Sequence, residues 1–184
     1  MSDHIRDVIR LALILGQRVG EITGMRADEI DLKNRIWVLA PDRVKNGIAH
    51  SVPLPDMAVS IIAQRMASIN KHLFPGRYGD GAPLLATAPN RALQRSLERL
   101  GLEPFTVHDI RRSVNSQLAR LGVSSEIRSR LLNHVSGRRA SVTENVYNVH
   151  QYDEEKRFAL GIWTAELERI LSGSETSNVV VLRS

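Results

Sequence analysis

A histidine and an arginine three residues apart are the first candidates for chemistry. They are His108 and Arg111 in the stretch TVHDIRRS. Thr106 and Asp109 have the spacing of a capping box, which predicts that a helix begins at Thr106. His108 and Arg111 then share a face beside the helix N-terminus, where free N–H groups favour phosphate and arginine can bind it with two hydrogen bonds. We expect an anion site here, although each residue alone has a plainer interpretation. Taken alone, Asp109 would be a helix cap, Arg111 would form a surface salt bridge and His108 would be a packed core histidine.

Two further polar positions have the same character. A glycine ends the helix predicted over residues 3–15, which places Arg18 at the mouth of the next helix, with Glu21 three residues on as its partner. Lys45 lies at the edge of an Asn-Gly turn, the strongest short hairpin signal. Taken singly, these are an ordinary ion pair and a solubilising turn lysine. Together with the first pair they indicate a cationic site.

Late in the chain, one histidine and two tyrosines complete the candidates. His134 directly follows a predicted helix and begins a loop, and Tyr147 and Tyr152 stand near predicted helix ends. A capping histidine and tyrosines with packed rings and solvated hydroxyls are the plainer interpretations. The remaining histidines lack metal-ligand spacing, so we expect no metal site.

The composition fits one soluble domain. The 184 residues are 42% hydrophobic and 24% charged, enough for a real core. The absence of cysteine excludes disulfides, thiolate zinc sites and cysteine nucleophiles. No run approaches the roughly 18 apolar residues of a membrane span, and the N-terminus lacks the layout of a secretory signal. We therefore expect a cytoplasmic protein without a membrane partner.

The charge balance favours a polyanionic partner, though only weakly. Lys and Arg number 25 against 20 Asp and Glu, a net charge of +5. Aromatic residues make up 4% of the chain, which argues against a single-strand binder built on stacked rings.

The periodicity predicts a mainly helical α+β domain with a small antiparallel sheet at one edge. The sheet is expected from about residue 30 to 54, with DRVK and AHSVPLP flanking the Asn-Gly turn. After the first two helices, further helices are expected over residues 55–70, 90–101, 106 onward, 124–134, 142–150 and 153–173. The tail ends in VVVL, which cannot bury itself alone and is expected to dock on this molecule or a neighbour.

The candidates form a more telling set in chain order, namely Arg18, Lys45, His108, Arg111, His134 and Tyr147. This set resembles the tyrosine recombinases, the phage integrase family, and above all the integrases of phages and genomic islands. The matching segments are LGQRVGEITGMRADEIDL, DRVKNGIAHSVPLP, TVHDIRRSVNSQLARLGVSSEIRSRLLNH and VYNVHQYDEEKRFALGIW. They extend over roughly residues 5–170. HxxR alone is weak, whereas HDIRR, a helix, a Gly-Val turn, a helix ending in NH and a tyrosine form a specific series.

The resemblance implies the tyrosine recombinase catalytic fold, with a three-stranded antiparallel sheet, over residues 1–173. It also implies that the family's N-terminal core-binding domain is absent here, and that residues 174–184 form a tail docking in cis or in trans. The spacing from His134 to Tyr147 is longer than in many members, so Tyr152 is a second candidate nucleophile. Tyr147 is preferred because it matches the family's tyrosine after a Thr-initiated helix.

The resemblance further implies cleavage and rejoining of DNA strands through a 3′-phosphotyrosyl intermediate, without metal, ATP or another cofactor. Arg18 and Arg111 would neutralise the phosphate, Tyr147 would attack it and Lys45 would protonate the departing 5′ oxygen. His108 and His134 would assist. Glu21 would position Arg18.

The expected partner is double-stranded DNA, bound by a homotetramer, with a monomer as the state of the isolated chain. When bound, the protein would be associated with the nucleoid. Five arginines near the site in sequence are candidates for contacts to the DNA backbone: Arg112, Arg128, Arg130, Arg138 and Arg139.

Three alternatives stand beside this interpretation. Residues 107–134 could form a helix-turn-helix or belong to a decayed recombinase that binds without cutting, but neither accounts for the complete set of candidates. A type IB topoisomerase would use related chemistry, although the length and the VPLP hairpin favour an integrase. A metal nuclease is disfavoured because no carboxylate cluster is visible.

Overall fold

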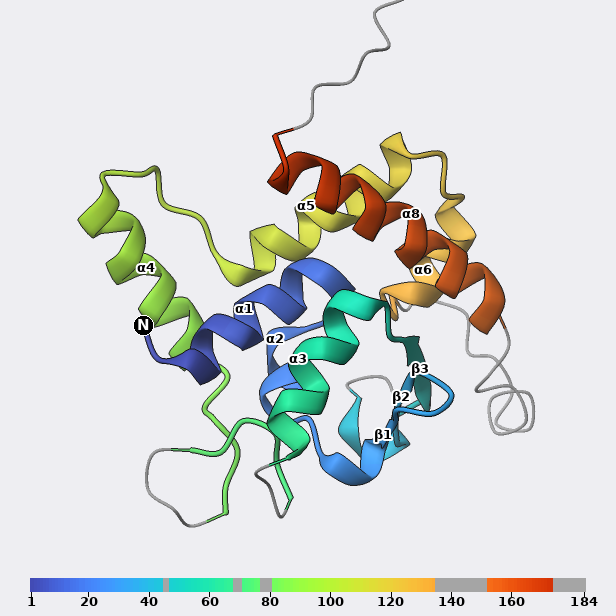
Figure 1. The fold of residues 1–184 in the computed structure, drawn as a ribbon, viewed down its shortest axis with the longest axis horizontal. Coiled ribbons are helices and arrows are strands. Elements are labelled where there is room, and N and C mark those ends of the chain that lie inside the picture. The colour runs from blue at the N-terminus through green and yellow to red at the C-terminus, as the bar shows by residue number, and fades with distance from the viewer. Residues whose placement is uncertain (45–46, 68–70, 77–80, 135–151, 174–184) are drawn as a thin grey trace, which may run out of the picture.

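The computed structural model describes residues 1–44, 47–67, 71–76, 81–134 and 152–173. Helices surround a central helix, α1, and a small sheet lies at one edge (Figure 1). The described helices are α1 (Asp3–Leu15), α2 (Val19–Thr23), α3 (Asp56–Met66), α4 (Ala88–Leu100), α5 (Val107–Arg120), α6 (Ser125–Leu131) and α8 (Asp153–Leu171). This confirms the mainly helical α+β fold with a small antiparallel sheet at its edge.

Helix α1 forms the centre of the core, and its last five residues, Leu11–Leu15, are all apolar. It contacts α2, α3, α4, α5 and α8, and Leu11, Ala12 and Leu15 are fully buried. The helix ends at Gly16, as predicted, with a φ of 66° in the left-handed region that glycine tolerates best. A Cβ at Gly16 would lie 2.8 Å from the Leu132 side chain. The glycine therefore brings the end of α1 against the segment that follows α6.

The sheet is three-stranded and antiparallel in the order β1-β2-β3, as expected. Its strands are β1 (Ile30–Asp31), β2 (Ile36–Leu39) and β3 (His50–Pro53). Trp37 pairs with Val52, and every residue of β3 is buried. Helix α8 covers β3, so this strand is enclosed and its polar residues need partners inside the protein.

The predicted hairpin pairing was wrong in one respect. Asp42 and Arg43 do not lie in a strand, because Pro41 lacks a backbone N–H and begins a 3-10 turn over Pro41–Arg43 (η2). The paired strands are Ile36–Leu39 and His50–Pro53, joined by a longer connection. Arg43 consequently turns inward and away from the strand ladder.

Helix α5 begins as the capping box predicted. The Thr106 hydroxyl accepts a hydrogen bond from the Asp109 N–H at 3.1 Å, and the Asp109 carboxylate accepts one from the Thr106 N–H at 3.0 Å. Hydrogen bonds that the Asp109 carboxylate accepts from the Thr106 hydroxyl and from the Thr106 N–H hold the pKa of Asp109 below its usual value. The position of Arg111 one turn into α5 is therefore fixed by a local sequence signal.

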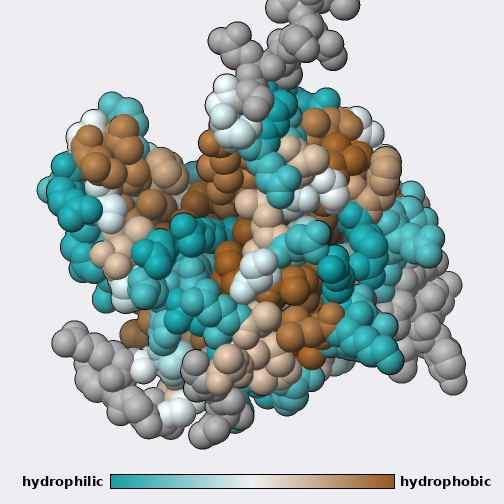
Figure 2. All heavy atoms as spheres, viewed as in Figure 1, coloured by the Kyte–Doolittle hydropathy of each residue, from teal (hydrophilic) through white to brown (hydrophobic). Residues whose placement is uncertain are grey.

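Helices α3 and α4 also match their predictions in outline. Helix α3 follows Pro55, and Gly101 ends α4 in the left-handed conformation with a φ of 64°. In Figure 2, apolar atoms gather over the outer end of α4, where Leu100, Leu102 and Phe105 are exposed. The described part of the chain therefore leaves apolar surface uncovered at this end.

Two predicted elements lie outside the described residues, namely the helix over 142–150 and the tail over 174–184. Among the helices that are described, none is long and apolar enough to cross a membrane.

Candidate active site

Arg111 is a buried cation held by backbone carbonyls. Its exposed fraction is 5%, and its guanidinium donates to Gly16 O at 2.9 Å and also to Leu132 O. Burial, followed by the charge of Arg18, lowers its pKa to about 10, so it stays charged at neutral pH. The surface salt bridge considered for Arg111 was therefore wrong. The residue instead joins the end of α1 to the segment after α6.

Arg18 is held beside it in a similar way. Its guanidinium donates to Glu21 Oε1 at 3.0 Å and to Asn133 O at 2.8 Å. Glu21 is buried and also accepts from the Arg18 backbone N–H at 3.2 Å, so one carboxylate fixes both ends of the residue. The side chain of Arg18 stays 33% exposed, which leaves it accessible to a ligand.

The two arginines thus donate to the carbonyls of consecutive residues, Leu132 and Asn133. The Glu21 carboxylate forms an ion pair with Arg18, and its negative charge also opposes the lowering of the Arg111 pKa by burial. Two guanidinium groups against one carboxylate leave an excess of positive charge, which suits a phosphate. We call Arg18, Arg111 and Glu21 the arginine clamp.

His134 directly follows the two carbonyls that hold the clamp. Burial, then the charges of Arg111 and Arg18, lower its pKa, with smaller contributions from His108 and Arg128. The neutral imidazole is therefore the main form at pH 7. His108 itself is exposed, so the packed core histidine considered for it was wrong. His134 therefore lies within electrostatic reach of the clamp, and His108 within electrostatic reach of His134.

His50 in β3 is a further histidine at the site. Its exposed fraction is 6%, and burial followed by the charges of Lys156, Arg111 and Arg18 lowers its pKa to about 3. Among the described residues its Nε2 has no hydrogen-bond partner. His50 is therefore a neutral, buried imidazole among cations.

Next to His50, Lys156 fastens the first turn of α8 to β3. Its Nζ lies 2.7 Å from Asp153 Oδ1 and donates to Ser51 O at 2.9 Å and to Ser51 Oγ at 2.5 Å. Ser51 Oγ in turn donates to Asp153 at 2.5 Å. Burial lowers the pKa of Lys156, although Asp153 opposes this effect. These bonds set where α8 begins relative to the sheet.

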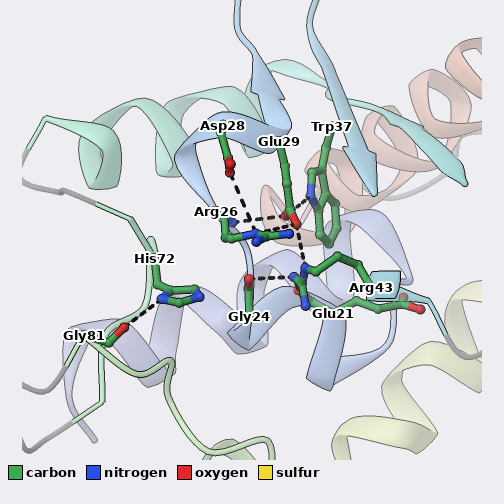
Figure 3. A network of polar contacts seen from close by, with 9 residues as sticks. All are labelled: Glu21, Gly24, Arg26, Asp28, Glu29, Trp37, Arg43, His72 and Gly81. Carbon is green, nitrogen blue, oxygen red and sulfur yellow. Dashed lines mark hydrogen bonds and ion pairs between the residues drawn. The ribbon is translucent and has the colours of Figure 1, made fainter. Parts of the chain in front are cut away.

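A third polar network surrounds Glu29 and is drawn in Figure 3. Its carboxylate accepts hydrogen bonds from Arg26, Trp37 and Arg43. Burial alone would raise the pKa of Glu29, but the hydrogen bonds from Arg43, Trp37 and the Arg26 backbone hold it below its usual value. The network connects β2, the turn at Ala27–Glu29 (η1) and the connection between β2 and β3.

Several predicted site residues lie outside the described part of the chain, namely Lys45, Arg138, Arg139 and Tyr147. Tyr152 is described. It caps the N-terminus of α8 with a φ of 69°, and the Arg130 guanidinium lies 3.8 Å from its ring centre. Tyr152 thus begins α8 and packs its ring against the Arg130 guanidinium.

The predicted DNA-backbone arginines that are described differ in exposure. Arg112 is exposed and lies 3.5 Å from Asp109. Arg128 donates to Val123 O and to the Asn115 side chain, which ties α6 to α5. Arg130 pairs with Glu126 at 3.2 Å in addition to covering Tyr152. Arg112 is the most accessible of these three.

The sequence reasoning missed His50, Lys156, Arg43 and Glu29. One signal was available for Lys156, because it has helical spacing with the buried residues Leu160, Trp163 and Leu167 of α8. A charged residue on an apolar stripe predicts a buried ion pair. No local pattern marks Arg43, since its partners come from other elements.

No group of three or more His, Asp or Glu suited to a metal ion is found among the residues that the structure describes.

Comparison with known proteins identifies the family of this chain. The family model described as "Phage integrase family" matches residues 2–154. The prophage integrase IntA of Escherichia coli (strain K12) is 28% identical over 177 residues, covering 95% of this chain and 41% of that protein.

Two solved structures show the same fold. The integrase from mycobacterium phage Brujita superposes with a TM-score of 0.69 at 21% identity, covering 89% of this chain and 52% of that one. The Tn1549 transposon integrase, solved in complex with a circular intermediate DNA, gives a TM-score of 0.61 at 17% identity, covering 89% and 57%.

The chain spans less than half the length of the curated relatives it matches, between 34% and 42%. Within that span the family match extends from α1 to the first turn of α8 and includes the arginine clamp. The chain belongs to the phage integrase family of tyrosine recombinases and has the fold of their catalytic domain.

Proposed function

We propose that this chain is the catalytic domain of a site-specific DNA recombinase that cleaves and rejoins strands through a 3′-phosphotyrosyl intermediate. The observation that carries the proposal is the arginine clamp, in which Arg18 and Arg111 donate to the carbonyls of consecutive residues. The carbonyls fix the guanidinium groups before any substrate arrives. Preorganised donors of this kind stabilise charge that develops in a transition state.

The proposed reaction is an in-line displacement at phosphorus. The Tyr147 hydroxyl loses its proton and attacks the phosphorus, while the bond from phosphorus to the 5′ oxygen breaks. Lys45 gives its proton to that oxygen, which leaves as a 5′ hydroxyl. The clamp stabilises the added negative charge on the non-bridging oxygens.

The tyrosine needs help because its ordinary pKa is near 10. A neutral imidazole can accept a proton or donate a hydrogen bond, and the lowered pKa of His134 favours this form. His108 is assigned a hydrogen bond to the phosphate. Because the protein–DNA bond conserves the energy of the phosphodiester, a second 5′ hydroxyl can reverse the step on another strand, which requires neither ATP nor a metal.

Double-stranded DNA is the proposed substrate and a homotetramer the proposed assembly. The DNA in the Tn1549 integrase complex supports the choice of substrate, together with the net charge of +5. The VVVL tail is proposed to dock in trans within the tetramer. Deletion of residues 174–184 should then weaken assembly on DNA, and unchanged assembly would remove this part of the proposal.

A covalent-trapping assay tests the proposed reaction. The protein is incubated in EDTA with nicked suicide duplexes from a candidate attachment region, and denaturing gels are used to detect attached DNA. We expect a covalent band from the wild-type chain and from Tyr152→Phe, and none from Tyr147→Phe.

Other outcomes separate the alternatives. Loss of the band only in Tyr152→Phe keeps the reaction and overturns the choice of nucleophile. DNA binding without any band favours a binding module or a decayed recombinase. Relaxation of supercoils without strand exchange favours a topoisomerase, and cleavage that EDTA abolishes favours a metal nuclease.

A further inference from the structure

Arg43 makes contacts that no sequence pattern predicted. Its Nε donates to Glu29 Oε1 at 2.6 Å, and its Nη2 donates to Gly24 O at 2.6 Å and to Glu21 O at 3.4 Å. The side chain is 19% exposed. Figure 3 draws its contacts with Glu29 and Gly24. One guanidinium therefore joins the connection between β2 and β3 to the end of α2.

Glu21 makes this link relevant to the arginine clamp. Its carboxylate holds Arg18, while its own backbone carbonyl accepts from Arg43. Arg43 and Arg18 are thus bound to the same residue, Arg43 at the Glu21 backbone carbonyl and Arg18 at the Glu21 carboxylate.

The packing around the Arg43 guanidinium is close. A Cβ on Gly24 would lie 2.8 Å from Arg43 Nη1 and 3.0 Å from Nη2, so a residue other than glycine would push the guanidinium out of place. Glu29, which is 8% exposed, also receives hydrogen bonds from Trp37 at 3.0 Å and from Arg26 at 3.2 Å. The acceptor for Arg43 is therefore itself fixed by the sheet and η1.

Beyond Arg43, the described residues stop at Val44 and resume at Gly47. The Gly47 N–H donates to Val44 O at 3.1 Å, and Gly47 has a φ of 68°. The two residues between them in sequence are Lys45 and Asn46. Lys45 thus follows Arg43 by two positions, within a connection whose near end is tied to α2.

We propose that Arg43 is a positioning residue for the general acid. By binding Glu29, Gly24 and Glu21 together, Arg43 fixes the end of the described connection, two positions before Lys45 in sequence, relative to the arginine clamp. The inference rests on the proposed function, because it takes Lys45 as the proton donor. A displacement of about 1 Å at a catalytic group can cost about 100-fold in rate.

The test uses a substrate that does not need a proton donor. In a 5′-bridging phosphorothiolate duplex, sulfur replaces the 5′ oxygen at the scissile bond. Tyr147 attack then expels a thiolate, which is stable without a proton because thiols have a pKa near 8.5. The chain is mixed with ordinary and thiolate suicide duplexes, and single-turnover rates of covalent attachment are measured.

We expect Arg43→Ala to slow attachment to the ordinary duplex by about 10- to 100-fold and to the thiolate duplex by less than about threefold. Lys45→Ala should give the same pattern with a larger loss, within the roughly 10²- to 10⁴-fold contribution of general acids. Arg43→Lys keeps the charge but cannot reach all the acceptors at once, so it should show the pattern at an intermediate size.

Arg65→Ala is the matched control. Arg65 is 17% exposed and donates to Asp7 at 2.9 and 2.5 Å, so its loss removes a comparable ion pair between α3 and α1. It should lower the melting temperature without distinguishing between the two duplexes. Measurements at a temperature where all variants are folded keep the comparison valid.

Equal slowing of both duplexes by Arg43→Ala would overturn the inference, since Arg43 would then act through Arg18 or the fold. No slowing of either duplex would also overturn it. If the wild-type chain attaches to neither duplex, the proposed function fails and the inference with it. Rescue of Lys45→Ala but not of Arg43→Ala by the thiolate duplex refutes the inference alone.

Discussion

At the scale of single residues, the arginine clamp depends on backbone carbonyls more than on carboxylates. Arg111 donates to Gly16 O and Leu132 O, which are fixed by the end of α1 and the segment after α6. Carbonyls carry only partial charge, so the full positive charge of Arg111 is available to an anion. This arrangement fits a group that must bind phosphate, since a carboxylate partner would compete with the ligand.

Arg111→Lys keeps the charge, but we expect it to reduce the rate of covalent attachment strongly. Lysine cannot bridge two carbonyls and present a planar fork to phosphate. We expect covalent attachment to fall by about 100- to 1,000-fold, the usual cost of removing one such donor. The measurement is the single-turnover rate of attachment, with melting curves to verify folding.

Arg112→Lys provides the control at the adjacent position. Arg112 is exposed and its side chain pairs with Asp109, so the rate should change by less than about threefold. Comparable losses in the two variants would contradict the role of Arg111 in the clamp.

At the scale of elements, the site forms where the ends of α1, α5 and α6 meet. Gly16 lets α1 end against Leu132 and Val114, and its carbonyl is one of the acceptors for Arg111. Gly101, at the end of α4, has a similar φ but no atom within 4 Å of its ideal Cβ position. Both glycines have a left-handed backbone, but only Gly16 is closely packed. Comparing substitutions at the two positions therefore separates the cost of backbone strain from the cost of a packing clash.

Gly16→Ala should destabilise the protein more than Gly101→Ala. Each substitution imposes a left-handed alanine, which costs about 1–2 kcal/mol. Gly16→Ala adds a clash with Leu132 and Val114, worth about 1–3 kcal/mol more. Urea unfolding measures both values. Equal losses of unfolding free energy would show that the packing around Gly16 relaxes freely.

The sequence predicted those elements that have local signals. The Thr106–Asp109 capping box located α5, and Gly16 and Gly101 located the ends of α1 and α4. It did not predict contacts between distant elements. The strong Asn-Gly signal predicts a strand at Arg43. The structure has a 3-10 turn there instead, because Pro41 begins the turn and Arg43 forms a hydrogen bond to Glu29.

The candidate site shows the same division. The spacing of His108 and Arg111 was readable because both lie on α5. No local pattern marks His50. Its pKa is lowered by burial and by the charges of Lys156, Arg111 and Arg18, which lie on other elements. Burial and charge at a meeting point of several elements are not encoded in any one local pattern.

At the scale of the whole molecule, the cost of enclosing His50 should be visible in the pH dependence of stability. The pKa of His50 is about 3 in the folded protein, against 6.5 as the ordinary value. Unfolding therefore takes up a proton between these pH values. The stability contributed by keeping His50 neutral is complete above about pH 6.5 and is lost as the pH falls toward 3.

The predicted slope is about 1.4 kcal/mol of unfolding free energy per pH unit below pH 6 for this one group. His50→Asn should remove that part of the slope. Urea unfolding of both proteins between pH 8 and 4.5 measures it. The difference between them should be constant above pH 7.5, which serves as the internal control, and parallel curves at low pH would contradict the assignment.

Mass spectrometry of the trapped adduct would identify the residue that bonds covalently to DNA, which we propose is Tyr147. The adduct is digested with nuclease and trypsin, which should release residues 140–156 as one peptide that contains both Tyr147 and Tyr152. Fragmentation of that peptide then identifies the modified tyrosine. We expect a nucleotide 3′-phosphate on Tyr147. A nucleotide on Tyr152, or on no tyrosine at all, would contradict the proposal.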